Sequence, residues 1–205
     1  VGCNNARTRH NEGHIQVVKE LIKNDVIVLT TGCNGIACAM EGLLAPESAG
    51  VFCGPGLAEV CETVGIPPVL HMGSCVDNSR ILLAATEVVK AGGLGTDISD
   101  LPVAGSAPEW MSEKAISIGH YFVASGVYTV FGVGLPVSGA PVFKRYLFEE
   151  FEKLYGGMWD LEVDPVQHAS KMIAHIDAKR KALGIDRARE RTLVDMAARR
   201  DLTSA

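Results

Sequence analysis

The stretch HMGSCVDNSR, residues 71–80, decides the fold that this sequence predicts. The apolar run PPVL at residues 67–70 precedes it and suits a buried strand, and a run typical of a helix follows from Ile81. A Gly-Ser pair forms the turn between them, so Cys75 stands where a strand ends and a helix begins. In an open α/β sheet, ligands bind at this edge. A thiol there lies near the positive end of the helix dipole, which favours the thiolate, a good ligand for soft metals.

Two further cysteines occupy the same position relative to a strand and a helix. Gly32-Cys33 follows the apolar run VIVLTT at residues 26–31 and leads into a predicted helix. GCNN at residues 2–5 also precedes a predicted helix, and the strand before it would lie upstream of residue 1. Because the carboxyl ends of parallel strands meet at one edge of a sheet, we expect three thiols to converge there: Cys3, Cys33 and Cys75.

Strands and helices alternate along the whole chain, which is typical of a doubly wound, mostly parallel, Rossmann-like α/β sheet flanked by helices. The other predicted strands are residues 51–52, 100–104, 127–132 and 159–163. The predicted helices are residues 11–23, 34–44, 77–91, 112–124, 142–154 and 166–183, with another ending at residue 64. We assign a Rossmann-like domain to residues 1–185 and a charged helical tail to residues 186–205.

Composition and charge exclude several classes of protein. Hydrophobic residues make up 47% and charged residues 21% of the 205 residues, which is typical of a globular protein with a full core. No apolar run approaches the ~18 residues of a membrane span, and no signal peptide is visible. The net charge is −5, made up of +4 on residues 179–205 and −9 on residues 1–178, and an acidic body argues against nucleic-acid binding. Because the sequence begins inside a candidate functional turn without an initiator Met, we expect a fragment or an excised domain.

The six cysteines indicate a reducing compartment and metal or redox chemistry, although several could be small buried hydrophobes. Cys38 lies five residues after Cys33, which places it roughly 140° away around a helix, so we expect it to pack in the core. We expect the same of Cys61. Cys53 lies in a predicted turn, and a place near the site remains open for it.

The histidines and one lysine have no function that spacing alone would assign. His10 and His14 are four residues apart and could share a helix face as a metal pair, but we favour surface or turn positions. We expect His168 and His175 to be exposed. Lys114 lies in the first turn of a predicted helix capped by Ser112, where a cation is mildly unfavourable, so spacing favours a solvated lysine.

Four motifs together resemble the C-terminal domain of nickel–iron–sulfur carbon monoxide dehydrogenases. They are GCNN at residues 2–5, TTGC at 30–33, PPVLHMGSCVDNSR at 67–80 and PEWMSEKA at 108–115, in the order of that family. The resemblance extends from residue 1 to about residue 185. The stretch around Cys75 is highly specific, whereas GCNN and TTGC alone would be weak.

The resemblance implies a cluster of one nickel, four irons and bridging sulfides (a Ni-4Fe-4S or 5S type) and the reaction CO + H2O to CO2, two protons and two electrons. It implies that Cys75 ligates nickel and that Cys3 and Cys33 ligate iron. Lys114 matches a lysine that hydrogen-bonds the bound CO2 or carboxylate. Ile118 matches a residue that packs beside the open nickel site. Soft thiolates suit such clusters.

The resemblance also implies parts that this sequence lacks. The family uses a histidine and two cysteines of an upstream domain, a proton-shuttling histidine, and 4Fe-4S clusters bound by N-terminal cysteines. We therefore expect this chain alone to be inactive. The resemblance further implies a cytoplasmic enzyme of anaerobic prokaryotes and a homodimer. Its partners would be a ferredoxin-like electron carrier and acetyl-CoA synthase, with neither nucleic acid nor membrane involved.

Two other hypotheses stay open. The chain could be a metal-binding or iron–sulfur module without turnover, which would use the cysteines but not Lys114. It could also be a structural or nucleotide-binding Rossmann-like domain, which predicts buried, reduced cysteines far from one another.

Overall fold

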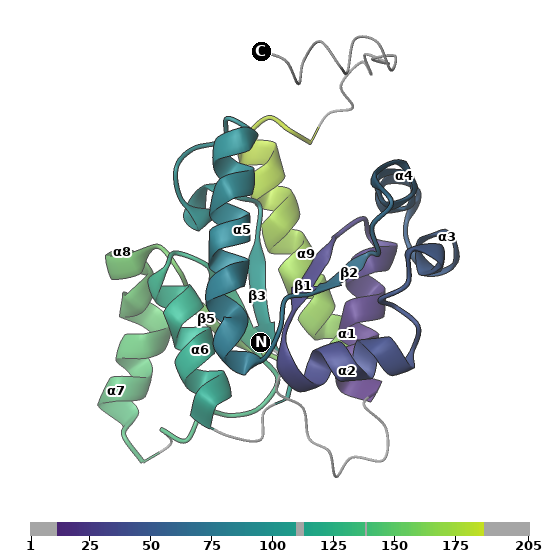
Figure 1. The fold of residues 1–205 in the computed structure, drawn as a ribbon. Helices are drawn as coiled ribbons and strands as arrows, with labels where there is room; N and C mark the ends of the chain where they lie inside the picture. The colour runs from purple at the N-terminus through teal and green to yellow at the C-terminus, as the bar shows by residue number, and fades with distance from the viewer. Residues whose placement is uncertain (1–11, 110–112, 138, 187–205) are drawn as a thin grey trace.

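The computed structural model describes residues 12–109, 113–137 and 139–186 (Figure 1). Parallel strands flanked by helices alternate along these ranges, which confirms the predicted α/β fold class. The described strands are β1 (Val28–Thr30), β2 (Val69–His71), β3 (Ala104–Ala107), β4 (Tyr128–Phe131) and β5 (Trp159–Leu161).

The described α-helices are α1 (Glu12–Lys23), α2 (Gly32–Met40), α3 (Ala49–Phe52), α4 (Pro55–Val64), α5 (Asn78–Ala91), α6 (Glu113–Ala124), α7 (Pro141–Arg145), α8 (Phe151–Tyr155) and α9 (Pro165–Ala182). Short 3-10 turns occupy Pro46–Ser48, Cys75–Asp77 and Ile98–Asp100, and a π-helical turn spans Tyr146–Glu150. No described helix combines the length and apolar character that crossing a membrane requires.

The strands form two parallel sheets in the described ranges, so the prediction of one continuous sheet is wrong there. One sheet pairs β1 with β2, and in the other β4 lies between β3 and β5. Residues of β1 and β3 both line a partly open cavity of about 670 Å³. Figure 1 shows β1 and β2 grouped with α1–α4, and β5 grouped with α6–α8, while α5, β3 and α9 lie in the middle.

Helix α1 connects the two halves through its two apolar stripes. Ile22 belongs to a core cluster that includes Val69 of β2. Val17, five residues earlier and on another face of the helix, belongs to a second cluster with Val130 of β4 and Met172 of α9. Burial on both stripes explains why the helix is apolar over a wide arc, and it fixes the first sheet relative to the second.

Strand β4 is buried along its whole length, as expected of the central strand of a parallel sheet covered on both faces. Tyr128 and Val130 face the cluster that contains α1 and α9. Phe131 faces the opposite cluster and stacks on Trp159, with 4.4 Å between ring centroids. The parallel pairing of β3 with β4, which sets Ala107 opposite Phe131, positions the carboxyl end of β3 beside β4.

Three predicted elements differ from the structure for local reasons. Residues 51–52, predicted as a strand, continue the helical path of the turn Pro46–Ser48 into α3. The strand predicted at 100–104 is β3 at Ala104–Ala107, because Asp97 and Asp100 form a capping box that makes residues 98–100 a 3-10 turn. The single helix predicted over 142–154 is interrupted by the π-helical turn between α7 and α8.

Gly132 offers a test of the contact between the end of β4 and the loop after β3. A Cβ atom there would lie 1.8 Å from the Pro108 carbonyl oxygen, which is backbone and cannot move away. We expect Gly132→Ala to lower the free energy of unfolding by about 1–3 kcal/mol in urea denaturation. Gly134→Ala is the matched control, because a Cβ there meets nothing within 4 Å, and it should change stability by about 0.5 kcal/mol or less. Equal losses in both variants would contradict the packing at Gly132.

Candidate metal centre

Cys33 and Cys75 lie on neighbouring turns at the carboxyl ends of β1 and β2. The two strands pair in register, with Thr30 opposite His71. Beyond the last pair, the Gly32 N–H donates to the Gly73 carbonyl oxygen at 2.8 Å. Both glycines have positive φ, 61° and 122°, which L side chains rarely adopt. This hydrogen bond therefore joins the two turns. Cys33 follows Gly32 directly, and Cys75 lies two residues after Gly73.

Two buried asparagines support these turns from inside. The Asn34 side-chain amide donates to the Thr30 hydroxyl at 2.7 Å. The Asn78 amide donates to the Thr31 hydroxyl at 2.9 Å and to the Cys75 carbonyl oxygen at 2.7 Å. Asn78 thus connects the backbone of one cysteine turn to the residue that precedes the other turn.

A capping box fixes the residues around Cys75 from outside. The Ser74 N–H and hydroxyl both donate to the Asp77 carboxylate, at 2.7 and 2.8 Å. These hydrogen bonds hold the pKa of Asp77 below its usual range, so its carboxylate is charged at neutral pH. Arg80 Nε lies 3.2 Å from the same carboxylate. The Cys75 turn is therefore ordered by hydrogen bonds within the protein itself.

Burial separates the described cysteines into two groups. Cys33 is exposed and Cys75 is half-buried, so both thiols have access to a ligand. Cys38 and Cys61 are fully buried in the core, as predicted. Burial raises the pKa of Cys38 to about 12 and that of the half-buried Cys53 to about 11, which keeps both thiols protonated. Cys53 packs against the same core cluster as Cys38 and not at the carboxyl ends of the strands.

The other predicted site residues fall in different places. Lys114 is the second residue of α6 and is exposed, at the helix that follows β3. Ile118, one turn later, is half-buried against a core cluster that also includes Met72, the residue after β2. Cys3 lies outside the described residues, together with His10 and Ser112. Within the described ranges, no group of three or more His, Cys, Asp or Glu side chains could hold a metal ion.

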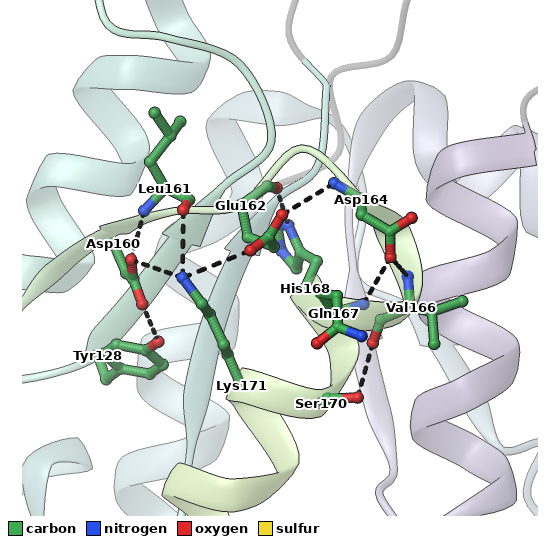
Figure 2. Close-up of polar contacts among 10 residues, drawn as sticks. All are labelled: Tyr128, Asp160, Leu161, Glu162, Asp164, Val166, Gln167, His168, Ser170 and Lys171. Atoms are coloured by element: carbon green, nitrogen blue, oxygen red, sulfur yellow. Dashed lines mark hydrogen bonds and ion pairs between the residues drawn. The ribbon is translucent and has the colours of Figure 1, made fainter.

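His168 is buried, with 1% of its surface exposed, so the prediction of an exposed histidine is wrong. Its Nδ1 donates to the Glu162 carbonyl oxygen at 3.0 Å, because a carbonyl can only accept (Figure 2). Its Nε2 therefore accepts from the Ser106 hydroxyl at 2.8 Å. Burial lowers the pKa of His168 to about 4. The sequence does contain a signal for this position, because residues 168, 172 and 176 form an i, i+4, i+8 stripe.

Lys171 is the centre of a polar cluster beside His168. Its ammonium donates to the Asp160 carboxylate at 3.1 Å and to the Leu161 carbonyl oxygen at 3.2 Å (Figure 2). The Tyr128 hydroxyl donates to the same carboxylate at 2.5 Å. Burial raises the pKa of Asp160, but these hydrogen bonds outweigh it and hold the pKa below its usual range. The cluster joins β4, β5 and α9.

His175, also predicted to be exposed, is half-buried and stacks on Tyr128.

His14 is also buried, with 1% of its surface exposed, although we predicted a surface or turn position. Its Nε2 lies 3.6 Å from Glu109 Oε2, on the loop after β3. Burial lowers the pKa of His14 to about 4, so at neutral pH this is a contact between a neutral imidazole and a carboxylate. The interaction connects the start of α1 to the segment that leads toward α6.

Comparison with known proteins identifies the family of this fold. The model of the Prismane/CO dehydrogenase family matches residues 1–166. This chain belongs to that family. Carbon monoxide dehydrogenase 1 of Methanosarcina mazei is 57% identical over 186 residues, which are 91% of this chain and 29% of that protein. The chain therefore spans less than a third of the length of this relative.

Two solved structures of relatives share the fold. The Ni-free carbon monoxide dehydrogenase of Thermococcus sp. AM4 superposes with a TM-score of 0.82 at 55% identity, covering 89% of this chain and 28% of that one. An acetyl-CoA synthase/carbon monoxide dehydrogenase, with NiZn[Fe4S4] and NiNi[Fe4S4] clusters in its alpha subunits, superposes with a TM-score of 0.81 at 37% identity. It covers 90% of this chain and 28% of the matched chain. Nickel and iron–sulfur centres thus occur among the relatives of this fold.

The two buried histidines predict how stability depends on pH. Their pKa values fall from 6.5 to about 4 on folding, so the unfolded chain binds more protons between these values. Stability should therefore fall as the pH is lowered from about 6.5 toward 4, by on the order of 3 kcal/mol for each histidine. Urea midpoints measured between pH 7 and pH 4.5 test this. His168→Gln should flatten the pH dependence, and an unchanged slope in that variant would contradict the assignment.

Proposed function

We propose that this chain is the C-terminal part of a carbon monoxide dehydrogenase catalytic subunit, which interconverts CO + H2O and CO2 with two protons and two electrons. The observation that supports this most directly is the pair of accessible thiols, Cys33 and Cys75, on hydrogen-bonded turns of a family member. A purely structural domain would bury its cysteines, as this chain buries Cys38 and Cys61.

The donor set fits a nickel–iron–sulfur cluster. In this proposal Cys75 binds nickel, and Cys33 and Cys3 bind iron. Thiolates are the soft ligands that these metals and sulfide prefer, and both described thiols are reachable from solvent. When bound, the cluster supplies the two-electron redox chemistry of CO. The remaining ligands, and the 4Fe-4S clusters that pass electrons on, belong to the part of the subunit that precedes this chain.

Lys114 stabilises negative charge on the substrate. Its ammonium belongs to the first turn of α6, where the helix N-terminus is positive and a cation is mildly unfavourable. An anionic cluster and a carboxylate-like substrate would offset that cost. A fixed donor of this kind contributes about 3 kcal/mol to the stabilisation of developing charge. Ile118, half-buried one turn later, packs beside the position where CO binds.

The same proposal includes the cellular location, the oligomeric state and the partners of the complete enzyme. The working enzyme is a cytoplasmic homodimer in an anaerobic prokaryote, and a ferredoxin-like carrier accepts its electrons. A carbon monoxide dehydrogenase/acetyl-CoA synthase subunit of Moorella thermoacetica is 39% identical to this chain, which supports acetyl-CoA synthase as a partner. This chain without the rest of the subunit has no complete ligand set and no turnover.

Lys114→Ala in the full-length subunit tests the catalytic role. We expect CO-dependent dye reduction to fall by about 10²–10³-fold, because a preorganised donor is lost, while nickel and iron contents stay unchanged. Lys144→Ala is the matched control, since Lys144 is an exposed lysine of α7, and it should leave the rate unchanged. Full activity in Lys114→Ala would contradict the catalytic role of Lys114, whereas a metal-loaded wild-type subunit without CO-dependent activity would favour a metal-binding module without turnover.

Cys75→Ala in the full-length subunit tests the metal site separately from turnover. We expect nickel to be lost from anaerobically purified protein, as measured by elemental analysis, because its thiolate ligand is gone. Cys61→Ala is the matched control, because it makes the same change in the buried core. It should lower the stability of the fold and leave the nickel content unchanged. If Cys75→Ala keeps its nickel, Cys75 is not the nickel ligand.

A further inference from the structure

The partly open cavity between the two sheets is lined by polar side chains at several places, among them Asp25, Thr129 and Arg180, and one group of them lies at the carboxyl ends of the strands. Along most of its length apolar side chains line it, including Val28, Val103 and Ile176. That group includes Thr30, Ser106, and three side chains discussed below, all at or just after the carboxyl ends of β1, β2 and β3 or at the start of α1. This polar end of the cavity therefore lies on the inner side of the turns that bear Cys33 and Cys75.

Three buried side chains at this end have polar atoms without a hydrogen-bond partner in the described part of the chain. They are the Oδ1 atoms of Asn34 and Asn78 and both ring nitrogens of His14, whose Nε2 lies 3.6 Å from Glu109 Oε2, beyond hydrogen-bond distance. These residues are 1%, 8% and 4% exposed. Buried polar groups are almost always hydrogen-bonded because leaving one unsatisfied is costly, so three such side chains lining one end of one cavity call for a common ligand.

The chemistry of these atoms specifies the ligand. Both N–H groups of the Asn78 amide are used by the Thr31 hydroxyl and the Cys75 carbonyl, which leaves its oxygen as an acceptor. The Asn34 amide likewise donates to Thr30 and leaves its oxygen. A neutral imidazole has one donor and one acceptor. Water matches this set, because it can donate to two amide oxygens and accept from the His14 N–H.

We propose that the polar end of this cavity binds ordered water that joins His14, Asn34 and Asn78. The three side chains come from α1, α2 and α5. Two of these helices adjoin the described cysteine turns: α2 contains Cys33, and α5 follows the 3-10 turn that contains Cys75. The bound water is a shared hydrogen-bonding centre behind the turns of Cys33 and Cys75, and His14 acts as a positioning residue for them.

The water itself can be tested without any assumption about function. A crystal structure of the full-length subunit should show ordered density within about 3.2 Å of both amide oxygens and a His14 nitrogen. His14→Leu should remove or displace this density, and His14→Gln, which can still donate and accept, should keep it. His168→Leu is the matched control, because His168 is equally buried but both its nitrogens have protein partners, and it should leave the density in place. A dry polar end, or density with the short contacts of a metal ion, would overturn the proposal.

The positioning role rests on the proposed function and has its own measurement. Removing groups that orient metal ligands typically weakens metal affinity ~10–100-fold. We expect nickel retention under chelator challenge to fall by about tenfold in His14→Leu, and to recover in His14→Gln. Equal retention in all variants, with the density lost in His14→Leu, would overturn the positioning role. Absence of nickel from the wild-type subunit would instead contradict the proposed function, while the crystallographic result would still decide whether the water is bound.

Discussion

The parallel pairing of β1 with β2 is the constraint on which the candidate centre depends. Thr30 lies opposite His71, and the ladder is extended past the strands by the hydrogen bond from Gly32 to Gly73. This bond requires both turns to leave the sheet at the same level. A shift of one residue would turn every side chain of the strand to the other face and separate the two cysteine turns. The positive φ values of Gly32 and Gly73 thus serve both the local turns and the strand register that brings these turns together.

Burial keeps several titratable side chains in the described core uncharged at neutral pH. His14 and His168 are neutral at pH 7 because burial lowers their pKa values, and Cys38 stays protonated because burial raises its pKa. Lys171, in the first half of α9, forms ion pairs with Asp160 and Glu162, and all three side chains are partly exposed. The thiols of Cys33 and Cys75 differ from that of Cys38, because Cys33 is exposed and Cys75 is half-buried.

The sequence predicted helices and strands well where hydrophobic periodicity and turn residues agreed. It failed where contacts between distant segments decided the burial of a residue or the pairing of strands. Cys75 at a strand-to-helix turn and the core position of Cys38 followed from apolar runs, glycines and helical spacing. The predictions for His14 and His168 were wrong because burial of a polar residue on an apolar stripe requires a hydrogen-bond partner. That partner is a residue distant in the sequence or a ligand, and neither can be seen in the local pattern. His168 finds Ser106, which is 62 residues away. The division into two sheets was not predicted either, because it depends on tertiary contacts such as those that α1 makes with both of them.

The geometry of the described turns does not require a metal for its order. The capping box at Ser74, the bonds from Asn78 and the glycine contact are all made within the protein. Metal sites that form only on binding must use binding energy to order their ligands, which lowers the apparent affinity. Here two of the three proposed ligands from this chain stand on turns that folding alone has ordered. Nickel and iron would therefore meet a partly preorganised site, and assembly would need to position only the ligands contributed by other segments.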